Sequence, residues 1–160
     1  MALLMSASAT FAQIKTTKIK NQNTEHYITT IINYPIAGLY ALQKQVEPIT
    51  VLNADGTGMM QNEDLVKEPI VWGIECSESG IPIFKEGFDS AAYSFWYKKA
   101  KATEEEEWTY QSFTIHFNKM KMFIAGERFK EFTEEELKRQ KVNSLKVFCL
   151  RIFFQHKEPK

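Results

Sequence analysis

The chain has 160 residues, enough for one domain with a substantial core. Its 20 Lys and Arg residues balance its 20 Asp and Glu residues. Because no net field would attract nucleic acid or an anionic membrane, we expect no nucleic-acid partner. No apolar run approaches the length of a transmembrane helix, so we expect no membrane insertion.

Residues 1–12 are mainly apolar and small, and they end in Thr10-Phe11-Ala12, a pattern typical of the approach to a signal-peptidase site. The charged n-region of a signal peptide is missing. The sequence therefore predicts a truncated signal peptide over 1–12 and a secreted or periplasmic bacterial protein. The alternative is a frayed tail on a cytosolic protein. Residues 13–24 are polar and basic, and we expect a flexible lead-in to a single domain over 25–160.

From residue 26 onward, short runs rich in β-branched and aromatic residues alternate with turn residues. Such spacing favours successive antiparallel hairpins, arranged as an up-and-down barrel or a two-sheet sandwich. The expected strands cover 26–32, 36–43, 48–52, 57–60, 69–76, 81–85, 91–97, 108–117, 120–124 and 129–132.

The clearest hairpin is centred on Asp55-Gly56, between two strand-like runs. Asp and Gly tolerate positive φ, which predicts a type I′ turn at this point. Gly38, inside an earlier strand, predicts a bulge or a close approach by another backbone.

The hydrophobic period changes only near the C-terminus. Thr133 and Glu136 have the spacing of a capping box, and Lys138, Arg139 and Lys141 follow in a final basic turn. We therefore expect one short surface helix there. The run 144–154 is apolar on both faces of an extended chain, which predicts a terminal strand covered on both sides.

Several of these residues resemble motifs of lipocalins and related calycins. Gly38-Leu39-Tyr40 is similar to the Gly-x-Trp opening of that family, with Tyr in place of the usual Trp. The turn Asn53-Ala-Asp-Gly-Thr-Gly58 resembles a hairpin of bacterial lipocalin-like secreted domains, and 71–74 and 119–124 lie where that family has later strands. The resemblance spans 36–132. It implies an all-β, antiparallel up-and-down β-barrel, here with one short C-terminal helix, whose interior holds a small apolar ligand.

The residues that usually carry chemistry are sparse. His26, His116 and His156 belong to no metal-ligand or catalytic spacing, and no phosphate-binding or nucleophile motif is present. Four consecutive glutamates at 104–107 cannot converge on one ion from an extended loop. We therefore predict no enzyme activity, no cofactor and no metal. The sequence leaves open whether Cys76 and Cys149 pair.

Two functional hypotheses follow. In the first, inward aromatic and aliphatic side chains form a cavity for a small hydrophobic ligand. The predicted lining is Tyr40, Trp72, Phe95, Phe113, Ile115 and Met122. In the second, these side chains fill the barrel themselves, and the protein is a structural or protein-interaction domain that uses the arm 26–32 or the terminal strand. The sequence names no protein partner.

Overall fold

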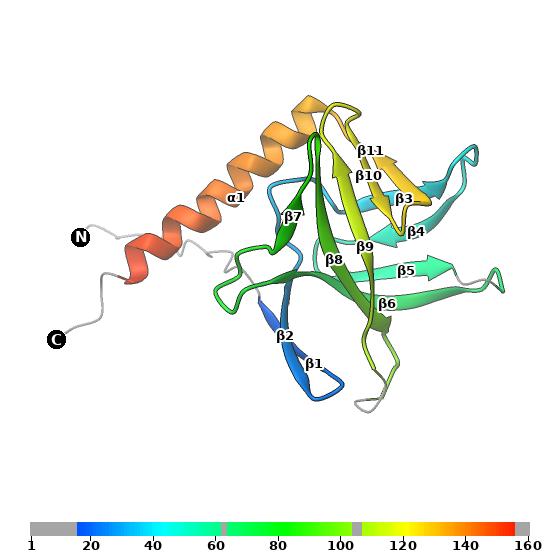
Figure 1. Cartoon of the computed structure of the whole chain (residues 1–160), viewed down its shortest axis with the longest axis horizontal. Coiled ribbons are helices and arrows are strands. Elements are labelled where there is room, and N and C mark those ends of the chain that lie inside the picture. Colours follow the sequence, from blue (N-terminus) through cyan, green and yellow to red (C-terminus); the bar gives the residue numbers. More distant parts are fainter. Residues whose placement is uncertain (1–15, 62–63, 104–106, 156–160) are drawn as a thin grey trace, which may run out of the picture.

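The computed structural model describes residues 16–61, 64–103 and 107–155, the last ten of these as backbone only. Eight antiparallel strands, β3 to β6 and β8 to β11, close into a barrel, and one helix leaves it (Figure 1). The elements are β1 Thr17–Asn21, β2 Thr24–Thr29, β3 Gly38–Leu42, β4 Pro48–Leu52, β5 Thr57–Gln61, β6 Lys67–Cys76, β7 Phe84–Glu86, β8 Ser90–Lys99, β9 Thr109–His116, β10 Lys121–Ile124, β11 Arg128–Glu131 and α1 Glu134–Gln155.

Two pairings close the barrel. Strand β3 pairs with β11, with Ala41 opposite Phe129, and β6 pairs with β8, with Trp72 opposite Tyr97. The other barrel strands pair with their neighbours in the chain, apart from β7, which lies at the edge beside β8. The predicted all-β antiparallel barrel is therefore confirmed, and no barrel edge is left open between its first and last strands.

Strict alternation decides which side chains enter the barrel. In β6, Ile70, Trp72, Ile74 and Cys76 are buried, as the sequence predicts for one face of this strand. Inward residues of seven of the eight strands contribute to one core cluster, and Phe132, which directly follows β11, adds to it. The segment between β2 and β3 adds Ile32 and Ile36 to it, which closes one end of the barrel.

The hairpin between β4 and β5 forms where the Asp55-Gly56 pair predicts it, but the turn type differs. Gly56 has φ 88°, and neither Ala54 nor Asp55 has positive φ, so the turn is not type I′. The amide of Gly56 donates to the carbonyl of Asn53. The carboxylate of Asp55 accepts hydrogen bonds from the amide and hydroxyl of Thr57. These bonds stabilise the observed turn, which differs from the two-residue type I′ turn.

A hairpin outside the barrel corrects another expectation. Thr17–Asn21, expected to belong to a flexible lead-in, form β1, which pairs with β2. Ile28 packs against Gly73 of the barrel wall, where a Cβ would lie 2.8 Å from the Ile28 side chain. Ile19, Ile28 and Trp96 bury one another there. Only Ile19 of the five residues of β1 is buried, so the sequence of this strand shows little hydrophobic alternation.

The predicted terminal strand over 144–154 is wrong, because the backbone remains helical to Gln155. The capping box is confirmed: the Thr133 amide donates to the Glu136 carboxylate, and the Glu136 amide donates to the Thr133 hydroxyl. No Gly or Pro interrupts 134–155, so nothing in the chain stops the helix once it has started. Within the described residues, α1 lacks the combination of length and apolarity needed to span a membrane.

Candidate functional site

The barrel brings all six predicted lining residues together. Tyr40, Trp72, Phe95, Phe113, Ile115 and Met122 lie in the main core cluster, each at most 2% exposed. The ring centroids of Trp72 and Phe95 are 5.9 Å apart, and those of Tyr40 and Phe113 are 6.5 Å apart. These contacts show how the residues pack against one another, and they leave ligand binding by them a hypothesis.

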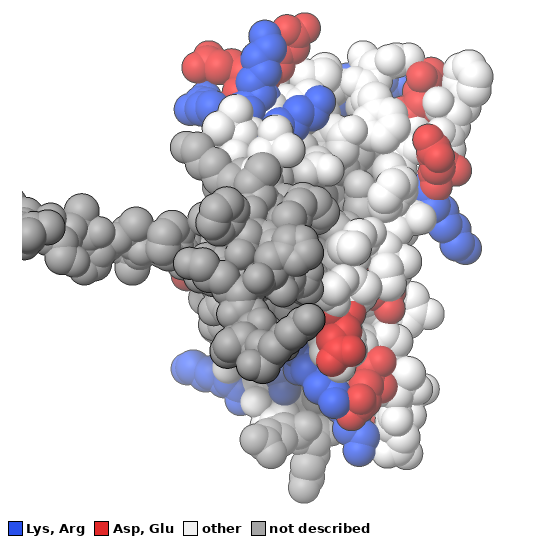
Figure 2. All heavy atoms as spheres, turned by 90° about the vertical axis from the view of Figure 1, so that its left-hand side faces the viewer, with Lys and Arg blue, Asp and Glu red and all other residues white. Residues whose placement is uncertain are grey.

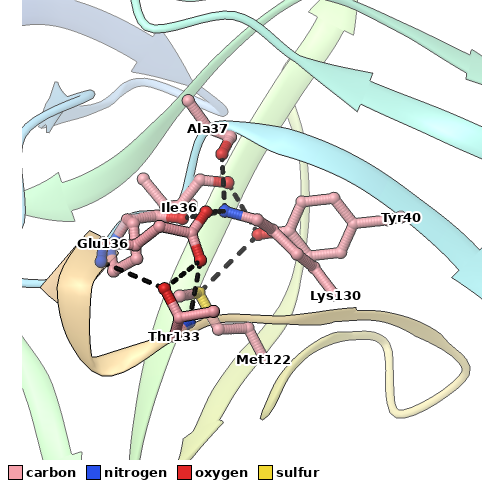
Figure 3. Close-up of polar contacts among 8 residues, drawn as sticks. Ile36, Ala37, Tyr40, Met122, Lys130, Thr133 and Glu136 are labelled. Atoms are coloured by element: carbon pink, nitrogen blue, oxygen red, sulfur yellow. Dashed lines mark hydrogen bonds and ion pairs between the residues drawn. The ribbon is translucent and has the colours of Figure 1, made fainter. Parts of the chain in front are cut away.

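The barrel end nearest α1 is held by Lys130 (Figure 3). Its ammonium group donates to the carbonyl oxygens of Pro35 at 2.6 Å and Ala37 at 2.9 Å, and it lies 3.7 Å from the Glu136 carboxylate. Burial lowers the pKa of Lys130 below its usual value, although the nearby Glu136 opposes this. One cation thus joins β11, the segment before β3 and the first turn of α1.

Tyr40 lies beside this connection. Its hydroxyl donates to the Ile36 carbonyl at 2.7 Å and lies 3.8 Å from the Met122 sulfur, and burial holds its pKa well above the usual range. The Tyr40 hydroxyl is neutral and buried, and its proton is engaged in a hydrogen bond, so this group is not suited to proton transfer. We therefore interpret this end of the barrel as structural.

The capping box gives a testable pH dependence. The hydrogen bond from the Thr133 amide is the main reason why the pKa of Glu136 is lowered. The stabilisation by ionised Glu136 is then fully present above its unfolded-state pKa of 4.5 and is lost as the pH falls through the lower folded-state value. Glu136→Gln should flatten the fall in unfolding free energy below pH 4.5, measured by urea denaturation. The exposed Glu134→Gln should leave that slope unchanged.

The opposite end of the barrel, called here the Arg128 end, carries polar side chains that face inward. Arg128 starts β11, Gln111 lies near the start of β9, and Tyr97 lies near the end of β8. Gln111 shares its face with the buried Phe113, and Arg128 is the cross-strand partner of the buried Ile124. The Gln111 amide donates to the Tyr97 hydroxyl at 3.2 Å.

Hydrogen-bonding capacity at this end is only partly used. Arg128 Nη2 donates to the Gln61 carbonyl at 3.2 Å, while its buried Nη1 atom has no hydrogen-bond partner in the described part of the chain. The same holds for the buried Oε1 of Gln111 and, on the inner face of β4, for Oγ1 of Thr50. Leaving a buried polar group unsatisfied costs about 1–3 kcal/mol, so such groups commonly mark a bound water or ligand.

Sequence reasoning missed these three residues. The sequence placed Arg128 in a turn, and the search for an apolar lining passed over polar residues on the inner face. The available signal was the period of two in β9, which puts Gln111 in line with Phe113 and Ile115.

The described histidines and cysteine, His26, His116 and Cys76, lie in separate packing environments. His26 Nδ1 lies 3.0 Å from a Glu75 carboxylate oxygen on the outer wall of the barrel. Burial acts to raise the pKa of Glu75, but hydrogen bonds with His26 and Ser94 outweigh this effect and lower the pKa. His116 packs its ring on Phe123. Cys76 is a buried free thiol whose pKa burial raises to about 11. His156, the side chain of Cys149 and glutamates 104–106 lie outside the described residues.

Neither a metal site in the described residues nor similarity to known proteins assigns a function to this chain. Within residues 16–61, 64–103 and 107–155, no three His, Cys, Asp or Glu side chains lie together as metal ligands would. No family model, curated protein or solved structure matches this chain.

Two outer surfaces remain as alternatives to the Arg128 end. A shallow hollow of about 300 Å³ lies on the wall over β10 and β11, lined by Gln43, Lys44, Lys121, Phe123 and Phe129. On the side of the molecule that carries α1 and β7, Figure 2 shows charged residues of both signs near the upper and lower margins. The arm leading into and out of β7 exposes Ile81, Ile83, Phe84 and Phe88.

Proposed function

We propose that this protein is a non-catalytic, lipocalin-like binding domain that takes a small hydrophobic ligand at the Arg128 end of its barrel. The observation that carries the proposal is that two inward side chains of that end, Arg128 and Gln111, each have a buried polar atom with no hydrogen-bond partner in the described part of the chain. The end beside α1 is filled by Ile32, Ile36 and the contacts of Lys130, so we place the proposed entry at the Arg128 end.

The apolar part of such a ligand has suitable neighbours. Met60, Ile70 and Ile124 are buried inward residues near the ends of β5, β6 and β10. The rings of Phe95 and Tyr97, 5.7 Å apart, lead from the core to this end. Because the six predicted lining residues already pack on one another, we propose that the ligand contacts this end of the core without replacing its centre.

The neutral fluorophore N-phenyl-1-naphthylamine tests the proposal. We expect saturable binding by the wild-type protein, seen as increased probe fluorescence. Tyr97→Trp should weaken binding roughly tenfold, because the larger ring would occupy space that the probe needs. The control Phe88→Ser changes an exposed residue of the β7 arm and should leave the affinity unchanged.

The opposite results would favour the second hypothesis, a protein-interaction domain with a filled core. Absence of saturable probe binding would overturn the proposed function. Loss of binding in Phe88→Ser with full binding in Tyr97→Trp would do the same, and would move the binding surface to the exposed apolar arm around β7.

We further propose that the domain acts in the bacterial periplasm or outside the cell, on the basis of the pattern in residues 1–12, which lie outside the described part of the chain. N-terminal sequencing of protein isolated from its native host should give a residue near Gln13. A mature protein that keeps residues 1–12 would contradict export by this route.

A further inference from the structure

We propose that the ligand carries a carboxylate and that Arg128 is the cation that binds it at the Arg128 end. This inference rests on the proposed function and names the chemical class of its ligand. The occupant is a small amphiphile, with its anionic group among the inward polar side chains and its apolar part on the neighbouring core residues.

The first support is the charge of Arg128. The guanidinium is half-buried, and no acidic side chain of the described residues forms an ion pair with it. Within the described residues, its Nη2 atom donates to the Gln61 carbonyl, and its buried Nη1 atom has no hydrogen-bond partner. A buried cation is favourable when an anion accompanies it, and the planar guanidinium fork matches a carboxylate.

The second support is the pair formed by Gln111 and Tyr97. The Tyr97 hydroxyl is near enough to Arg128 for that charge to lower the phenol pKa, against the larger raising effect of burial. If the Gln111 amide turns over, Tyr97 can donate to Oε1, and the amide NH₂ group becomes free to donate. The cluster would then offer a carboxylate an amide donor in addition to the guanidinium.

The third support is that two described carboxylates form ion pairs with lysines and not with Arg128. Glu68, at the start of β6, lies 2.9 Å from the Lys99 ammonium at the end of β8, and Glu47 lies 2.8 Å from Lys67. Neither pair involves the guanidinium of Arg128, which stays available to an incoming carboxylate.

Decanoate and decanol, matched in chain length, test the inference by isothermal titration calorimetry. We expect the wild-type protein to bind decanoate at least about tenfold more tightly than decanol, as charge-assisted hydrogen bonds would give. Arg128→Met should abolish this preference, so that decanoate binds no more tightly than decanol. Arg139→Met, on an exposed turn of α1, is the matched control and should keep the wild-type preference.

A second variant guards against a folding defect in Arg128→Met. Gln111→Glu puts a carboxylate beside Arg128, so it should weaken decanoate binding about tenfold while decanol still binds. Equal binding of the two probes by the wild-type protein would overturn the carboxylate inference and leave the proposed function standing. A decanoate preference that survives in both variants would also overturn it. If neither probe binds, the proposed function itself fails.

Discussion

Replacing Gly58 with alanine is expected to lower the free energy of unfolding by about 3 kcal/mol. Gly58 lies in β5 opposite Leu52, and a Cβ at this position would come within 2.4 Å of the Val51 carbonyl oxygen. That oxygen belongs to the backbone of β4 and cannot move without disturbing the ladder between the two strands. Urea denaturation followed by tryptophan fluorescence measures the loss.

Gly126→Ala separates this close approach from a general preference for glycine. Gly126 has φ 74° but no atom within 4 Å of the position of a Cβ, so alanine there should cost only backbone strain, about 1 kcal/mol. Equal losses in the two variants would show that contact with Val51 does not make Gly58 necessary.

Replacing Lys130 with methionine is expected to lower the free energy of unfolding by about 3 kcal/mol. Methionine keeps much of the aliphatic stem beside Gly38, but it leaves the carbonyls of Pro35 and Ala37 without their donor. Each unsatisfied buried group costs about 1–3 kcal/mol, and the Lys130 side chain is only 12% exposed. The same urea titration measures the change.

Lys121→Met is the matched control. Lys121 lies on the neighbouring strand β10, and its ion pair with Glu131 is partly exposed to solvent. Such a pair contributes less than about 1 kcal/mol, so this variant should unfold almost as the wild type does. A loss in Lys130→Met no larger than in Lys121→Met would contradict the role of Lys130 in closing the barrel.

Sequence patterns predicted the barrel because inward apolar residues recur at every second position of its strands. Ile70, Trp72 and Ile74 on one strand, and Tyr93, Phe95 and Tyr97 on another, keep a period of two. The C-terminal run misled the prediction because it is apolar at almost every position, and such a run fits a covered strand or a helix equally well. Its helical start at Thr133 was the deciding feature.

The Arg128 end could not be predicted in the same way. Arg128 and Gln111 are 17 positions apart, and nothing local marks either residue as inward facing in a cluster. Their faces follow from the register of β9, β10 and β11, which fixes Ile124 opposite Arg128 and Phe113 opposite Ile124. Register is a property of paired strands, so a single run of residues does not contain it.

The sequence by itself determined the antiparallel strands, the hairpin at Asn53 to Gly58 and the capping box of Thr133, because each depends on residues that are close in the chain. The tertiary structure alone decided that β3 meets β11, that Lys130 reaches back to Pro35, and that Arg128 faces the barrel interior without an acidic partner in the described part of the chain. These contacts join residues from distant strands, and closure of the barrel is what brings them within hydrogen-bonding distance.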